Sequence, residues 1–165
     1  IMVALELNAK GQYQTKAAIL NFVALKQVCY AFEGGGCWMQ DLSFNNKLVR
    51  LRVKPNQHIN NWLILGDRPQ VFNIPILINE AAINKFAFRN FGSSSYAAML
   101  FLMNKADCFI GSNLDKTSFE AISMLMRESG AFAKVFESKS KYLIATNQLV
   151  NLSMAAASPT KTTSV

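Results

Sequence analysis

Residues 48–54, which read LVRLRVK, decide how the first half of the chain is interpreted, because they show the most regular strand pattern in the sequence. Apolar side chains at every second position alternate with the cations Arg50, Arg52 and Lys54. A period of two places successive side chains on opposite faces of a β-strand. The stretch therefore predicts a strand with one apolar face and one cationic face.

The cationic face of this strand is the main candidate for a binding site. Four cations and His58 fall between positions 42 and 66, with no acidic residue among them. Cations two residues apart on a strand are separated by roughly 6.5–7 Å, which is similar to the phosphate spacing of an extended nucleic acid. Two nearby tryptophans offer rings for base stacking. The candidate nucleic-acid-binding residues are Lys47, Arg50, Arg52, Lys54, Trp38 and Trp62.

This set of residues favours a non-catalytic nucleic-acid-binding protein. Cationic grooves with stacking aromatics bind single strands with little sequence preference. We therefore expect a single-stranded RNA or DNA partner, bound without sequence specificity. The competing interpretation is that the cations form a solvated face or protect an exposed sheet edge.

The overall composition supports this function and one alternative. A net charge of +7 and a pI near 9.5 favour polyanionic partners. Only 16% of the residues are charged, and a surface with few charges is typical of proteins that pack against neighbours. The alternative prediction is a structural subunit that self-associates into a filament, a shell or a nucleocapsid-like assembly.

Several strands are expected in the N-terminal half. Alternating apolar residues predict a first strand over residues 2–7. The segment Thr15–Glu33 fits either a helix capped by Thr15 or two strands, Ala18–Leu25 and Gln27–Phe32, and the sequence leaves both open. Short apolar runs predict further strands over Trp62–Leu65 and Val71–Ile78.

Helices dominate the expected C-terminal half. Asn79 is a suitable cap for a helix that ends at Gly92, and Ser93–Ser95 can start a second helix that runs to about Lys105. The residues from Thr117 to Glu120 form a capping box, which predicts a helix ending near Gly130. Short strands are expected at Asp107–Ile110 and Tyr142–Thr146. The predicted fold class is α+β, with an antiparallel, curled sheet from the N-terminal half packed against helices mainly from the C-terminal half.

The length of 165 residues predicts one domain. Residues 1–152 are expected to form a single α+β domain, and the hydrophobic fraction of 51% is enough for a core without cross-links. Residues 153–165 are small and polar around one proline, so they predict a flexible tail.

The cysteine usage indicates an intracellular, reducing compartment, such as the cytoplasm, an organelle matrix or a virion interior. The three cysteines are odd in number and form no close pair, unlike a disulfide framework or a zinc site. We therefore expect no metal and no cofactor. No apolar run reaches the roughly 18–20 residues of a membrane span, and the N-terminus lacks the basic region of a signal peptide.

Evidence for catalysis is sparse in the sequence. The pair Cys37-Trp38 resembles the nucleophile region of viral papain-like proteases, and that resemblance implies His58 as the base. This protease is a minor alternative. The scattered acids support no glycosidase or two-metal site, and Gly111-Ser112-Asn113 is interpreted as a turn. The sequence alone therefore predicts that the chain is not an enzyme.

One family resemblance points the same way as the basic strand. Residues 74–81, IPILINEA, follow several expected strands and precede an expected apolar helix. This order resembles the sheet-then-helix unit of Whirly and related single-strand-binding proteins. Residues 16–20, KAAIL, are similar to the first strand of a Whirly domain. The resemblance implies a single-strand-binding function.

Overall fold

The structure is a computed structural model of the whole chain, and it describes residues 2–9, 12–43, 46–55, 61–66, 76–78, 85–112, 114–137, 141–147 and 152–154. Within these ranges the elements form two five-stranded sheets, two α-helices and one small two-stranded sheet.

The N-terminal sheet is an antiparallel meander in which each strand pairs with the next one along the chain. A sheet of this kind can be predicted from the local sequence pattern, because neighbouring antiparallel strands need only short turns between them. One of these turns is the 3₁₀ turn η1 (Val23–Leu25), which ends at Lys26 with a φ of 52°. The strands are β1 (Met2–Ala9), β2 (Gln12–Phe22), β3 (Gln27–Phe32), β4 (Gly36–Asp41) and β5 (Leu48–Leu51).

The second sheet is mixed. Its strand order is β10-β11-β9-β6-β8, and β6 runs parallel to both of its neighbours, β8 and β9. Its members are β6 (Asn61–Gly66), β8 (Lys85–Asn90), β9 (Cys108–Ser112), β10 (Phe132–Glu137) and β11 (Lys141–Thr146). The small sheet pairs β7 (Ile76–Ile78) with β12 (Leu152–Met154).

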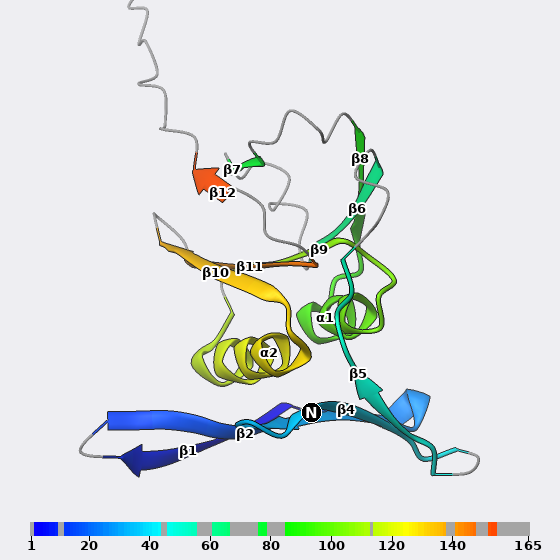
Figure 1. Cartoon of the computed structure of the whole chain (residues 1–165), viewed down its shortest axis with the longest axis vertical. Coiled ribbons are helices and arrows are strands. Elements are labelled where there is room, and N and C mark those ends of the chain that lie inside the picture. Colours follow the sequence, from blue (N-terminus) through cyan, green and yellow to red (C-terminus); the bar gives the residue numbers. More distant parts are fainter. Residues whose placement is uncertain are drawn as a thin grey trace, which may run out of the picture.

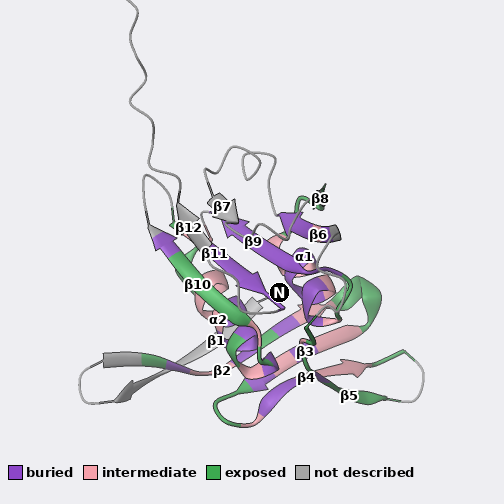
Figure 2. Cartoon of the chain, turned by 45° about the horizontal axis from the view of Figure 1, so that its top comes forward, coloured by how far each residue is buried: buried purple, intermediate pink, exposed green. Residues whose placement is uncertain are grey.

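Both helices lie between the two large sheets, so the molecule has three layers (Figure 1). Helix α1 (Ser94–Leu102) and helix α2 (Lys116–Ser129) share one hydrophobic core with residues of both sheets. Figure 2 shows the buried strands β9 and β11 of the second sheet above this helix layer. Ile122, Leu125 and Met126 of α2 are completely buried, because a helix between two sheets has apolar surface on opposite sides.

Two hydrogen bonds join α2 to the N-terminal sheet. The Thr15 hydroxyl donates to Oε2 of Glu120 at 3.0 Å, and the Gly36 N–H donates to Oε2 of Glu128 at 3.2 Å. Glu120 was expected to complete a capping box with Thr117, and that prediction is wrong. The helix begins two residues earlier, with Asp115 as its cap, so the Glu120 carboxylate is free to reach the sheet.

The predicted fold class is confirmed, since the N-terminal half forms an antiparallel sheet and the helices lie in the C-terminal half. The segment Thr15–Glu33 forms most of β2 and all of β3, joined by η1, with Ala17 opposite Phe32 across the β2–β3 pair. Asp107–Ile110 and Tyr142–Thr146 coincide closely with β9 and β11. Helix α1 begins as expected, because the Ser93 side chain accepts a hydrogen bond from the N–H of Tyr96.

The helix predicted from Asn79 to Gly92 is wrong over residues 85–90, which form strand β8, and residues 79–84 lie outside the described residues. Apolar residues at 86 and 88 also alternate with period two, and parallel pairing with β6 selects that pattern. The sheet-then-helix unit of the Whirly resemblance is therefore absent from residues 85–90.

The predicted tail, residues 153–165, falls mainly outside the described residues. Ser153 and Met154 belong to strand β12. The single-domain prediction for residues 1–152 stays a prediction.

Candidate active site at the carboxyl edge of the parallel strands

Three parallel strands end at the same edge of the mixed sheet. Ile64 in the central strand β6 is opposite Phe88 of β8 on one side and Cys108 of β9 on the other. Strands in a sheet are about 4.8 Å apart, so the ends of β8 and β9 are about 10 Å apart. In sheets of this kind ligands bind at the carboxyl ends of the strands. We call this edge the carboxyl edge.

Both helices begin at the carboxyl edge, because α1 follows β8 and α2 follows β9 in the chain. The first N–H groups of a helix lack partners within the helix, and they carry a partial positive charge. A helix N-terminus therefore favours an anion such as a phosphate. Two such termini within one edge make the carboxyl edge a candidate for binding an anionic group.

The chain enters α1 through a tight turn. Gly92 has a φ of +65°, and its N–H donates to Oδ1 of Asn90 at 2.8 Å. Its position in the left-handed region explains the glycine, since side chains rarely adopt that conformation. Open space surrounds the position that a Cβ would take on Gly92. Ser93 then caps the helix by accepting from the N–H of Tyr96 at 3.3 Å.

The start of α2 is fixed by a carboxylate. Oδ1 of Asp115 accepts the N–H of Ser118 at 2.9 Å, and its other oxygen accepts the Ser118 hydroxyl. These hydrogen bonds, the hydroxyl first, lower the pKa of Asp115 below its ordinary value. Nearby, the ammonium group of Lys141 lies 4.0 Å from the centre of the Phe119 ring. The Asp115 carboxylate therefore caps α2, and both of its oxygens accept hydrogen bonds from Ser118.

A metal site is not formed by the residues that the structure describes. In these ranges no three Asp, Glu, His or Cys side chains lie close enough together to hold an ion. The Asp115 oxygens are directed at Ser118. Hard cations such as Mg²⁺ prefer carboxylate oxygens, so the described residues do not fit such a cation.

The cysteines are unsuited to nucleophilic catalysis. Cys29, Cys37 and Cys108 are free thiols with no exposed surface. Burial raises the pKa of Cys29 and of Cys37 to about 12 and also raises the pKa of Cys108. A nucleophilic cysteine needs a thiolate near neutral pH. The protease alternative is therefore wrong for Cys37, and His58, its expected base, lies outside the described residues.

The two tryptophans of the predicted nucleic-acid site are not placed to stack on bases. Trp62 is only 1% exposed and belongs to a small apolar cluster of the mixed sheet that includes Ile64 and Ile110, so its ring is unavailable to a base. Trp38 is half-buried, donates from Nε1 to the Gly35 carbonyl at 2.9 Å, and lies under the Arg50 guanidinium at 5.6 Å. Arg50 and Trp38 thus form a cation–π interaction with each other.

The remaining cations of the basic strand are exposed. Lys47, Arg52 and Lys54 have exposed side chains, and only Arg50 of the four lies within β5. The predicted apolar face is buried at Leu51, while Val49 is 37% exposed. The alternating pattern therefore marks an edge strand, in agreement with the competing interpretation of the sequence.

Comparison with known proteins identifies the fold. No protein-family model matches the sequence. No curated protein matches it either. Solved structures do: SuhB of Mycobacterium tuberculosis aligns with a TM-score of 0.64 and 15% identity, over 85% of this chain and 56% of that one. The chain shares the inositol monophosphatase fold.

Two further structures agree with this. The native extragenic suppressor protein SuhB of Bartonella henselae has a TM-score of 0.61 and 21% identity, over 85% of this chain and 54% of that one. Inositol monophosphatase II of Staphylococcus aureus has a TM-score of 0.60 and 15% identity, over 82% of this chain and 51% of that one. This chain therefore spans a little more than half the length of the structures it matches.

These matches correct the functional predictions made from the sequence. Neither a non-catalytic nucleic-acid-binding protein nor a structural assembly subunit agrees with them, because the matched structures include inositol monophosphatases. The same finding contradicts the expectations that the chain is not an enzyme, that nucleic acid is its partner and that no metal is involved. Alternating cations on a strand were the main support for the nucleic-acid prediction, and an edge strand produces the same pattern.

The structure also shows which site residues the sequence analysis missed. Ser93 was seen only as a helix start, and Asp115 was not recognised as the cap of α2. A sequence does not reveal that β6, β8 and β9 are parallel, so neither residue could be assigned to a shared edge. Within the part of the chain that the structure describes, no helix is long and apolar enough to cross a membrane.

Proposed function

We propose that this chain is part of a phosphatase that hydrolyses a small phosphate monoester at the carboxyl edge. The observation that supports this most is the fold, which is shared with SuhB and inositol monophosphatases over 81–85% of the chain at TM-scores of 0.57–0.64. One of these structures, staphylococcal inositol monophosphatase II, is described with 2′-AMP bound. A monoester of that size is our expected substrate class.

The two helix starts supply the expected binding groups. First-turn N–H groups at Ser94 and Lys116 would donate hydrogen bonds to the phosphate oxygens, as helix N-termini do with anions. Asp115 and Ser93 have a positioning role, because their side chains fix the first turns in place. Gly92 leaves open space beside the start of α1 for a substrate.

A divalent metal is implied by phosphatases of this fold, and it would polarise the phosphate and activate water. The described residues do not provide its ligands, so the role proposed for them is limited to binding and orienting the ester. We also propose an intracellular, reducing location, because the three buried thiols are unpaired.

The test is release of inorganic phosphate from 2′-AMP and related small monoesters, measured with added Mg²⁺ and again with excess chelator. The proposal expects release that depends on the added metal. Asp115→Ala should lower kcat/KM by about tenfold, since a misplaced first turn loses one charge-assisted contact.

Asp41→Ala is the matched control. Asp41 also accepts hydrogen bonds from the N–H and hydroxyl of a serine, Ser43, which lower its pKa, but it lies in the N-terminal sheet. We expect kcat/KM of this variant within about twofold of the parent. Absence of phosphate release from every ester, or equal losses in the two variants, would refute the proposal.

A further inference from the structure

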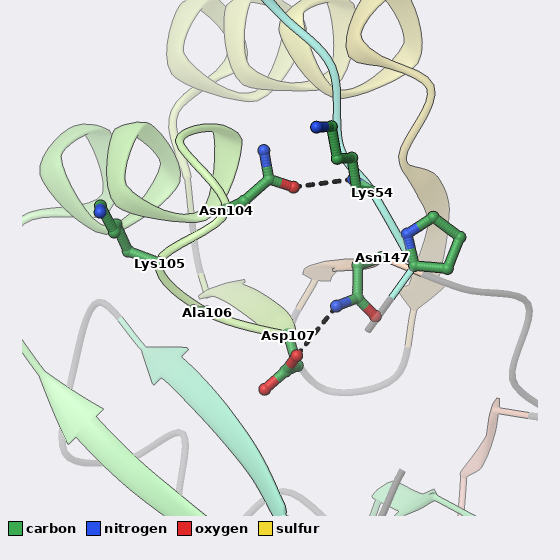
Figure 3. A pocket seen from close by; sticks show the side chains of 7 residues that line it. Lys54, Asn104, Lys105, Ala106, Asp107 and Asn147 are labelled. Carbon is green, nitrogen blue, oxygen red and sulfur yellow. Dashed lines mark hydrogen bonds between the residues drawn. The ribbon is translucent and has the colours of Figure 1, made fainter. Parts of the chain in front are cut away.

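A hollow lies at the edge of the mixed sheet opposite the carboxyl edge, where β9 begins and β11 ends (Figure 3). Its volume is about 320 Å³. A neighbouring hollow of about 390 Å³ shares Lys54, Asn104 and Lys105 with it and adds Arg50 and Arg52. We call the first of these the amino-edge hollow. Its lining residues are Lys54, Pro55, Asn104, Lys105, Ala106, Asp107 and Asn147.

Asn147 gives the amino-edge hollow a buried acceptor. Its side chain is only 5% exposed, and its Nδ2 donates to Oδ1 of Asp107 at 2.9 Å. The other oxygen of Asp107 accepts the N–H of Leu63 at 2.8 Å. Because a carboxylate accepts hydrogen bonds, the amide nitrogen of Asn147 must face Asp107. Its Oδ1 then has no partner within the described part of the chain.

A buried acceptor without a partner is rare, and it costs free energy unless a ligand or water satisfies it. The orientation of Asn147 is also fixed through the backbone, since its N–H donates to the carbonyl of Asp107 at 3.1 Å. The hollow therefore presents a rigid acceptor that needs a hydrogen-bond donor from outside the protein.

The cations beside it are held in place by one residue. Asn104 lies just after the end of α1 in the left-handed conformation, with a φ of 58°. Its Oδ1 accepts the N–H of Lys54 at 2.7 Å, and its Nδ2 donates to the carbonyl of Arg52 at 2.9 Å. Lys105 follows directly, and its N–H donates to the carbonyl of Leu100 at 3.0 Å. Asn104 thus holds the backbone of Lys54 beside the end of α1, so that both lysines line the hollow.

The charge of this region is strongly positive. Four cations line the two hollows, against the single carboxylate of Asp107, which is occupied by Leu63 and Asn147. Lys54 and Lys105 have exposed side chains that are available to an anion. Cations that converge on a concave surface attract small anions and raise their local concentration.

We propose that the amino-edge hollow binds a small anion that also carries a hydroxyl group. The phosphate or carboxylate would lie between Lys54 and Lys105, and the hydroxyl would donate to Oδ1 of Asn147. This site lies at the opposite edge of the sheet from the proposed catalytic site, and it does not depend on hydrolysis.

The test is isothermal titration of the full chain with chelator present, so that no metal-dependent turnover interferes. Glycerol 3-phosphate carries both groups, methyl phosphate lacks the hydroxyl, and glycerate replaces the phosphate with a carboxylate. We expect glycerol 3-phosphate to bind, and methyl phosphate to bind about tenfold more weakly, as the loss of one hydrogen bond to a buried acceptor predicts. Binding of glycerate would identify a carboxylate as sufficient, and failure of glycerate alone would restrict the ligand to phosphates.

Variants separate this site from the catalytic one. Lys54→Gln combined with Lys105→Gln should weaken glycerol 3-phosphate about tenfold or more, since each lysine contributes one charge-assisted contact. The control Lys47→Gln removes an exposed cation outside the hollow and should have no effect, and Asp115→Ala should bind normally. Equal affinities in the double variant and the control would overturn the proposal, because the lysines would then only offset the C-terminal dipole of α1. Undetectable binding, or equal binding of methyl phosphate, would also overturn it.

Discussion

The hydrogen bond between Thr15 and Glu120 should join the N-terminal sheet to α2 with a measurable coupling energy. Thr15 is 8% exposed, and its hydroxyl lies 3.0 Å from Oε2 of Glu120, which is 105 residues away in the sequence. Thr15→Val keeps the shape of the side chain but removes the donor. The Glu120 carboxylate then remains partly buried without this partner.

The magnitude follows from the kind of bond. Hydrogen bonds to charged groups contribute about 1.5–3 kcal/mol, and the partial exposure of Glu120 places this bond at about 1–2 kcal/mol. We expect Thr15→Val and Glu120→Ala each to lower the free energy of unfolding by about that amount. The double variant should lose less than the sum of the two, with a coupling of about 1 kcal/mol.

Urea unfolding of the four proteins measures this coupling. Thr117→Val is the control, because Thr117 is exposed on the same helix and should change stability by less than about 0.5 kcal/mol. Strict additivity of Thr15→Val and Glu120→Ala would show that this hydrogen bond does not join α2 to β2 in solution.

Two further predictions concern ionisation. Burial raises the pKa of Cys29 and of Cys37 to about 12, so the folded state keeps thiol protons that the unfolded state releases above its thiol pKa near 8.5. The stability that each thiol contributes is therefore complete below that pH, and it falls by about 1.4 kcal/mol per pH unit above it. Comparing the free energy of unfolding of the parent and of Cys29→Ala at pH 8 and pH 10 measures this loss. Asp115→Ala should cost about 1 kcal/mol at pH 7, and because hydrogen bonds from Ser118 lower the pKa of Asp115, that difference should shrink as the pH falls below about 4; a difference that grows in acid would contradict the capping role.

The local sequence pattern predicted most strands of the N-terminal sheet, but it left one segment open between helix and strand. The segment Thr15–Glu33 satisfied both a helix and a strand period, and only pairing such as Ala17 with Phe32 decided between them. The same limit caused the error at residues 85–90. There the choice depended on β6, which lies some twenty residues earlier in the chain. Non-local pairing of this kind leaves little trace in a local pattern.

The candidate site could not be predicted for a related reason. Its defining feature is that β6, β8 and β9 are parallel, so that α1 and α2 both start at one edge. Ser93 was recognised as a helix start without its place in the fold. The basic strand was recognised correctly as a chemical pattern, and Arg52 and Lys54 do line a hollow. Its assignment to nucleic acid also needed tryptophans for base stacking, and the ring of Trp62 is buried.

A crystal structure of the chain with 2′-AMP and Mg²⁺ would test the proposed function most directly. We predict that the phosphate group lies at the first turns of α1 and α2, within hydrogen-bond distance of their N–H groups. Density for the ester only in the amino-edge hollow, or no bound ester at a concentration that supports phosphate release, would contradict the assignment of catalysis to the carboxyl edge.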